Sequence, residues 1–297
     1  MPAPPLPLID PHHHLWDLSL YDYPWLAPRP APDPQASIRQ SYLLDDFLAD
    51  TRHQNLVKSV HVQAEIARHQ SVAETAWLQS IADQHGFPHG IVAFAALADD
   101  NVAAMLEAHA QYPNMRGIRQ LLNWHQDPAR SQCERPDYLT DGRWQAGYAR
   151  LATHNLSYDL QAYPVQLPDA ATLAGRFPQI PMIVNHTGMP FERSADALQV
   201  WRTGMRLVAE QPNTSVKISG LGMSDPHWTT DSFRPFVLET IEIFGVERSM
   251  FASNFPVDKI YGSFDTLFDA FKAITAHFSE SERRALFHDN AERIYRL

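Results

Sequence analysis

Two hydrophobic periods alternate along the chain. Short apolar runs, continuous or with a period of two, predict β-strands, and apolar stripes at three- and four-residue spacing predict α-helices. The predicted strands are residues 8–14, 57–65, 90–97, 116–121, 157–160, 181–185, 215–219 and 249–253. The predicted helices are about residues 71–85, 143–154, 196–210 and 280–295, with three more around Met105, Phe236 and Phe268. A long loop is predicted after the first strand, from Trp16 through Pro34.

This alternation predicts the fold class. Eight strands, nearly all followed by a helix and with no break in composition, favour a single α/β domain over residues 1–297, a (β/α)8 TIM barrel. An open doubly wound sheet is the alternative. That fold usually has a glycine-rich phosphate turn after its first strand, where this chain is rich in histidine. No repeat of 20–50 residues is visible, which argues against a solenoid.

The first predicted strand ends in three consecutive histidines, His12, His13 and His14. Side chains alternate along a strand, so His12 and His14 share one face, about 7 Å apart, and His13 takes the other. Two imidazoles on one face are half of a metal site or of a proton-handling site. A stray histidine tract is the alternative.

Polar side chains also follow the other predicted strands. In a barrel of this class, catalytic groups lie at the carboxyl ends of the strands. The candidates there are Gln63, Glu65, Arg119, Asp159, His186, Lys217, Ser219, Asn254 and Asp258. Several have a structural alternative: an ion pair for Arg119 and Lys217, a hydrogen-bonded core carboxylate for Asp159, and a rim cover rather than a lid for Trp16.

Composition limits the partners. The formal net charge of the 297 residues is −10, which argues against binding to nucleic acid or to an anionic membrane. No apolar run approaches the roughly 18 residues of a transmembrane helix, and the start of the chain lacks the features of a signal peptide. The single cysteine, Cys133, leaves no intrachain disulfide. We therefore expect a cytoplasmic protein that acts on a small molecule, with the oligomeric state open and a homodimer among its options.

Six motifs resemble the amidohydrolase-2 branch of the amidohydrolase superfamily. Within that branch the pattern is most similar to the sugar-acid and dicarboxylate lactonases, which include 2-pyrone-4,6-dicarboxylate, L-fucono- and L-rhamnono-lactonases. The motifs occur in the family's order over essentially the whole chain. They are Ile9-Asp-Pro-His-His-His-Leu-Trp-Asp, Tyr23-Pro-Trp-Leu, Gly117-Ile-Arg, Asn185-His-Thr-Gly, Val216-Lys-Ile-Ser-Gly-Leu and Met250-Phe-Ala-Ser-Asn-Phe-Pro.

The resemblance implies roles for particular residues. His12 and His14 form the family's His-x-His pair, which in some members holds one divalent metal, zinc or manganese, while other members work without one. His186 is the sixth-strand histidine. Arg119 would bind a substrate carboxylate or oxygen. Gln63, Trp16 and Asp159 are further candidates for substrate binding.

One position departs from the family pattern. The eighth strand normally supplies an aspartate that takes a proton from the attacking water, and this chain has Asn254 there. Asparagine cannot act as a general base and is a poorer metal ligand than a carboxylate. Asp258, Glu65 or Asp159 would have to take the role, or the chemistry differs.

Three functions follow as hypotheses. The leading one is a hydrolase that opens a lactone of a small carboxylated or sugar-acid compound. A metal-dependent decarboxylase of an aromatic or unsaturated acid is the second, and Asn254 counts against it. The third is a non-catalytic relative that binds a small acid.

Overall fold

The protein is a closed barrel of parallel strands. The computed structural model describes residues 6–297, in which all eight strands pair in sequence order and in parallel. The ring closes between the first strand and the segment after the last: His14 N donates to Phe255 O (2.7 Å) and Asn254 N to His12 O (2.8 Å). The (β/α)8 TIM barrel is confirmed. The strands are β1 (Leu8–His13), β2 (Leu56–Val62), β3 (Gly90–Ala93), β4 (Met115–Ile118), β5 (Ser157–Leu160), β6 (Met182–Val184), β7 (Thr214–Ile218) and β8 (Ser249–Phe251).

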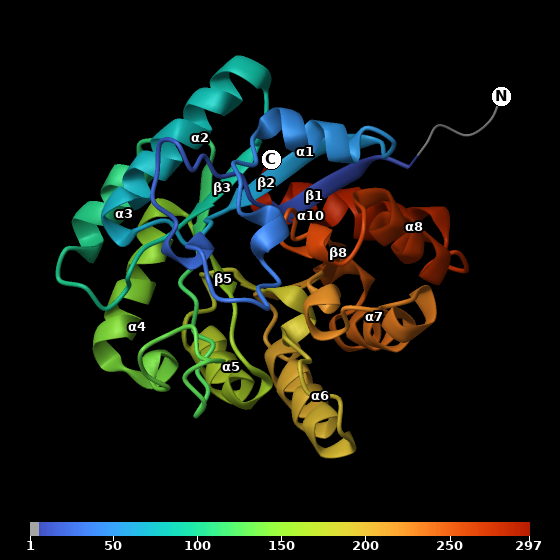
Figure 1. Cartoon of the computed structure of the whole chain (residues 1–297). Coiled ribbons are helices and arrows are strands. Elements are labelled where there is room, and N and C mark those ends of the chain that lie inside the picture. Colours follow the sequence, from blue (N-terminus) through green and yellow to red (C-terminus); the bar gives the residue numbers. More distant parts are fainter. Residues whose placement is uncertain (1–5) are drawn as a thin grey trace.

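Helices surround the strands on the outside (Figure 1). They are α1 (Leu44–Thr51), α2 (Ser71–His85), α3 (Val102–Ala110), α4 (Gly142–Ala149), α5 (Leu167–Arg176), α6 (Ala195–Ala209), α7 (Thr230–Phe244), α8 (Phe264–Ile274), α9 (Glu280–Arg284) and α10 (Asn290–Tyr295). Over the described residues 6–297, no helix is long and apolar enough to cross a membrane.

Three helical predictions need correction. No helix was predicted at α1, which lies between the predicted loop and β2, or at α5, which lies between β5 and β6. Each has only two to three turns, and the buried face of α5 is partly alanine (Ala170, Ala171, Ala174), so the pattern that would predict it is short. The predicted C-terminal helix over residues 280–295 is instead α9 and α10 joined by a π-helical segment, Ala285–Asp289.

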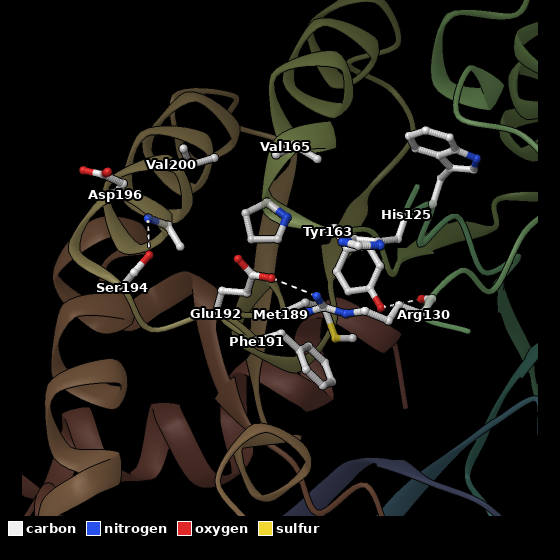
Figure 2. A pocket seen from close by; sticks show the side chains of 13 residues that line it. His125, Arg130, Tyr163, Val165, Met189, Phe191, Glu192, Ser194, Asp196 and Val200 are labelled. Atoms are coloured by element: carbon white, nitrogen blue, oxygen red, sulfur yellow. Dashed lines mark hydrogen bonds and ion pairs between the residues drawn. The ribbon is translucent and has the colours of Figure 1, made fainter. Parts of the chain in front are cut away.

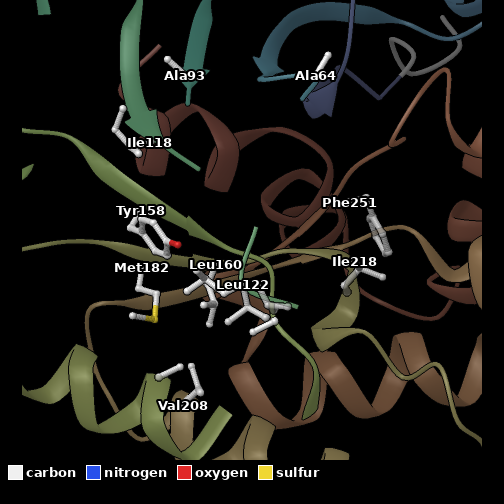
Figure 3. Close-up of a cluster of buried hydrophobic side chains, with 14 of the residues drawn as sticks. Ala64, Ala93, Ile118, Leu122, Tyr158, Leu160, Met182, Val208, Ile218 and Phe251 are labelled. Carbon is white, nitrogen blue, oxygen red and sulfur yellow. The ribbon is translucent and has the colours of Figure 1, made fainter. Parts of the chain in front are cut away.

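The apolar core has two layers. The larger layer lies between the strands and the surrounding helices, and includes Ile118, Leu160 and Val208 (Figure 3). The smaller layer joins residues of β1, β2, β3, β6 and β8 to α10, with Tyr295 fully buried. Helix α10 covers the amino ends of the strands. Arg296, the residue after α10, donates from Nη2 to the carbonyls of Arg116, near the start of β4 (3.2 Å), and Asn155, just before β5 (2.8 Å).

Six of the eight strands are shorter than predicted, and this places the polar residues. β2 ends at Val62 and β8 at Phe251, so Glu65 and Asn254 lie on loops beyond the strands. Both residues have positive φ angles, 55° and 57°. Non-glycine residues rarely adopt this conformation, and it is enriched at functional sites.

Candidate active site

Three histidines meet at the carboxyl end of the barrel. The ring centroids of His12 and His14 are 5.1 Å apart, and those of His12 and His186 are 4.5 Å apart. His13 points the other way and stacks on Phe47 of α1 at 4.0 Å. The predicted alternation of the three histidines is confirmed.

The local sequence explains how β1 presents these rings. The pairing of β1 with β2 shifts register between Asp10 and His13, around Pro11, which has no N–H for the ladder. Where the ladder is interrupted, the Asp10 carboxylate accepts hydrogen bonds from His12 N (3.2 Å), Ser253 N (2.9 Å) and Ser253 Oγ (2.6 Å). Burial raises the pKa of Asp10 to about 6. Asp10 therefore joins the end of β1 to the end of β8.

Each imidazole has a fixed neighbour. His14 Nδ1 lies 2.7 Å from the carbonyl of Val62, and His186 Nδ1 lies 3.0 Å from Ser219 Oγ. Since a carbonyl only accepts, His14 carries a proton on Nδ1. Burial lowers the pKa of both histidines well below the ordinary value, and Arg119 lowers it further. Both rings are therefore neutral near pH 7.

Arg119 is a buried cation beside the histidines. Its Nη2 donates to the carbonyl of Gln63 (2.6 Å) and its Nη1 to Gln161 Oε1 (3.0 Å), and Nη1 lies 3.4 Å from His12 Nε2. The Nε atom is buried and has no hydrogen-bond partner within residues 6–297. A buried donor without a partner is costly, and a ligand oxygen would satisfy it.

A second buried cation lies on the other side of His12. Lys217 Nζ is 3.3 Å from His12 Nδ1 and forms an ion pair with Asp159 Oδ1 at 2.5 Å. Tyr295 of α10 donates to the same carboxylate oxygen at 2.8 Å. All three side chains are fully buried. Burial lowers the pKa of Lys217 to about 8.

Asn254 lies between His14 and Asp258. Its Oδ1 is 3.3 Å from His14 Nε2, and its Nδ2 donates to Asp258 Oδ1 at 3.1 Å. Burial raises the pKa of Asp258 to about 7. Asp258 is thus an acid that exchanges its proton near neutrality, and it is linked to His14 through the Asn254 amide.

A cavity of about 490 Å³ opens above these residues. Five predicted site residues line it: His14, Glu65, Arg119, His186 and Asn254. This volume lies in the range of small-molecule sites. Its location, at the carboxyl ends of the strands, is where barrels of this class hold their active sites.

The other predicted site residues are not on the cavity wall. His12, Gln63 and Asp159 are fully buried beneath it, and Asp258 lies behind Asn254. Gln63 supplies a carbonyl to Arg119 and its side chain accepts from Glu65 N (2.6 Å). These four residues support the wall instead of forming it.

Trp16 also lies outside the cavity. It is fully buried, donates from its ring nitrogen to the carbonyl of Gln40 (2.7 Å), and packs at right angles on Trp25. Trp25, not Trp16, lines the cavity. Direct substrate contact by Trp16 does not agree with this placement, because its polar atom is already bonded away from the site.

The sequence missed several lining residues. Gln161, which holds Arg119, directly follows the predicted fifth strand, and that position was the available signal. Met189 and Phe191 follow the sixth strand, and Met223 follows the seventh. Apolar residues on loops give no chemical signal, so only the structure brings them to the site.

The donors, as placed, do not fit a divalent metal. No group of three or more His, Cys, Asp or Glu within residues 6–297 is arranged to hold one. His12, half of the predicted pair with His14, has Lys217 beside one ring nitrogen and Arg119 beside the other. Two cations at this range oppose a third positive ion. Asn254 occupies the place where a carboxylate would balance the charge.

A parallel barrel with a His-x-His pair at the end of β1, a third histidine after β6 and a buried arginine defines an amidohydrolase-type site. The amidohydrolase family model Amidohydro_2 matches residues 9–297. The chain belongs to this family.

Similar proteins support the assignment. A protein of Sinorhizobium fredii, named uncharacterized protein y4mH, is 47% identical and covers 98% of each chain. The L-fucono-1,5-lactonase of Burkholderia multivorans is 29% identical over 97% of this chain and 96% of its own. An amidohydrolase of Burkholderia multivorans, solved with bound zinc, has a TM-score of 0.83 and 26% identity, with 98% of this chain and 99% of that chain covered. Metal dependence is typical of the family.

Proposed function

We propose that the protein hydrolyses a lactone of a small carboxylated compound, a class that includes sugar-acid lactones. One observation carries the proposal. His14, His186 and Arg119 line one cavity, so that neutral imidazoles lie beside a buried cation whose Nε has no partner among the described residues. The lactonase name of the Burkholderia multivorans relative supports the same reaction.

Arg119 would bind the substrate's carboxylate. A guanidinium is a planar donor suited to a carboxylate, and charge-assisted hydrogen bonds are about twice as strong as neutral ones. Binding would also change the histidines. Arg119 is a cause of the lowered pKa of both His14 and His186, and a carboxylate beside it would offset that effect. The substrate would therefore make His186 a better base.

Water would attack the lactone carbonyl. In this proposal His186 Nε2 takes the proton, with Nδ1 held by Ser219 Oγ at 3.0 Å. A new carbon–oxygen bond forms and the ring carbon–oxygen bond breaks. The ring oxygen recovers the proton, so that a hydroxy acid leaves. Glu65, the carboxylate on the cavity wall, is the second candidate for the base.

Asp258 would position the Asn254 amide. His14 carries its proton on Nδ1, so Nε2 can only accept while the ring is neutral. When protonated, Asp258 donates to the amide oxygen and turns the Nδ2 toward His14 Nε2. When ionised, it accepts from Nδ2 and turns the amide oxygen toward His14. This role replaces the one in which Asp258 itself reaches the substrate.

A metal has no step in this mechanism. Zinc or manganese at His12 and His14 would require Lys217 and Arg119 to move, because they lie 3.3 and 3.4 Å from His12. Metal analysis of the purified protein and activity in a chelator test this part. Full activity in the chelator with no bound metal supports it, and loss of activity restored by zinc or manganese contradicts it.

A panel of γ- and δ-lactones tests the function, with acid release followed at constant pH. We expect at least one carboxylated lactone to be opened. His186→Gln should lower kcat/KM by about 10²–10⁴-fold, the usual contribution of a general base. His89→Gln is the control, because His89 lies just before β3, at the opposite end of the barrel.

Two results would overturn the proposal: no lactone of the panel is opened, or His186→Gln behaves like the wild type. Release of carbon dioxide from an aromatic or unsaturated acid would favour the decarboxylase hypothesis instead.

A further inference from the structure

A second cavity of about 350 Å³ lies beside the active-site cavity. We propose that it is a subsite for an uncharged apolar group, aryl or alkyl, carried by the lactone whose ring lies in the active-site cavity. This inference rests on the proposed function and names the substrate class more narrowly.

The two cavities share a wall. Met189 and Phe191, on the loop after β6, line both of them. The loop after β4 separates them elsewhere: Ser131 and Gln132 line the active-site cavity, while Arg130 lines the second one. A ligand in the active site therefore has an adjoining space beyond Phe191.

The lining of the second cavity is largely apolar. Tyr163 and Phe191 meet edge to face, with ring centroids 6.0 Å apart. Val165, just before α5, and Val200, on α6, both line the cavity (Figure 2), although they are 67% and 42% exposed. Scattered exposed apolar side chains need no explanation, but two that line one cavity indicate an apolar ligand.

The charges at the cavity are arranged for a neutral ligand. Arg130 Nη1 forms an ion pair with Glu192 Oε1 at 2.8 Å, shown by a dashed line in Figure 2. Tyr163 donates its hydroxyl proton to the carbonyl of Arg130 at 2.7 Å. The remaining charged group, Asp196, would repel an anion. A carboxylate is thus directed to Arg119, and an apolar group to the second cavity.

Its size favours a small-molecule group over a protein partner. The volume lies at the lower end of the range for small-molecule pockets. Because Met189 and Phe191 are common to both linings, an occupant of the second cavity lies next to the active site, which favours a group of the substrate itself.

Two lactones test this proposal: a butyrolactone carboxylate and its phenyl-substituted analogue. We expect the wild type to prefer the phenyl compound in kcat/KM. Val165→Glu and Val200→Glu should each lower that preference by about tenfold, because a methylene's worth of apolar contact already changes kcat/KM by that factor. Leu20→Glu is the matched control, since Leu20 is 60% exposed and outside both cavities.

The wild type showing no preference for the phenyl compound, or both valine variants keeping it, overturns the inference. Calorimetric binding of phenylpropanoate separates this failure from failure of the proposed function. If no lactone is hydrolysed, weaker phenylpropanoate binding in both valine variants than in Leu20→Glu still supports the subsite. Equal binding in all of them overturns it.

Discussion

At the scale of single residues, burial sets the protonation of the site. The histidines are kept neutral by burial and by two cations, and Asp258 is kept protonated to about pH 7. A group whose pKa differs between the folded and unfolded states makes stability depend on pH. The buried acids therefore give predictions that need no substrate.

Asp258→Asn should stabilise the protein above pH 7. The pKa of Asp258 is raised from the ordinary 3.8 to about 7, so between these values the folded state holds a proton that the unfolded state has lost. Wild-type stability therefore falls as pH rises through this range, and the variant lacks this loss. We expect an advantage of roughly 1–3 kcal/mol in the free energy of unfolding at pH 8 and little at pH 4.

Urea unfolding at both pH values measures this effect. Glu74→Gln is the matched variant away from Asn254. Burial raises the pKa of Glu74 to about 8, so this variant should also be more stable than the wild type at high pH. If the wild type is as stable as Asp258→Asn at pH 8, the raised pKa of Asp258 in the folded state is contradicted.

Arg119→Gln should raise KM for a carboxylated lactone by about 10- to 100-fold, since a hydrogen bond to a charged group contributes roughly 1.5–3 kcal/mol. For a lactone without a carboxylate the rise should be much smaller. Steady-state kinetics on the two substrates measure the difference, with the exposed Arg52→Gln as control. An equal rise for both lactones would show that Arg119 does not bind the carboxylate.

At the scale of elements, the loops after the strands decide where the functional groups point. His186 lies two residues after the end of β6 and has a φ of 53°. Its ring lies against the loop after β7. Gly220 in that loop has a φ of 67°, and a Cβ atom there would lie 2.8 Å from the His186 ring. Only glycine satisfies both the conformation and the close approach.

Gly220→Ala should therefore lower kcat/KM by at least about tenfold by displacing His186, and destabilise the fold by roughly 1 kcal/mol. Gly86→Ala is the control: Gly86 ends α2 with a φ of 77°, and nothing lies within 4 Å of its added Cβ. The control should lose similar stability and keep its activity. Unchanged activity in Gly220→Ala would disprove the steric role.

At the scale of the whole molecule, the C-terminal helix closes the barrel and reaches the site. Tyr295 of α10 packs inside the barrel and donates to Asp159, which holds Lys217 beside His12. The last turn of the chain is thus linked to the first strand. That residues 1–297 fold as a single domain stays a prediction.

Tyr295→Ala should cost about 3–5 kcal/mol in the free energy of unfolding, the usual loss for a large buried aromatic side chain. Tyr295→Phe should cost only about 1 kcal/mol, because it removes the hydrogen bond and keeps the packing. Urea unfolding separates the two. Equal losses would mean that the hydroxyl, and not the closure of the barrel, carries the effect.

The sequence by itself determined the barrel, because strand and helix periods are local properties of a chain. It also determined that His12 and His14 share a face, since side chains alternate along any strand. It failed where the signal was short: α1 has eight residues and α5 has ten.

Tertiary structure decided the site. Which polar residues line the cavity depends on where each strand ends, and a difference of two or three residues put Glu65 and Asn254 on the wall while Gln63 and Asp159 stayed beneath it. Lys217 and Arg119 come from distant strands to the two sides of His12. The protonation of the histidines follows from burial and from charges brought together across the barrel, and no local pattern in the chain encodes either.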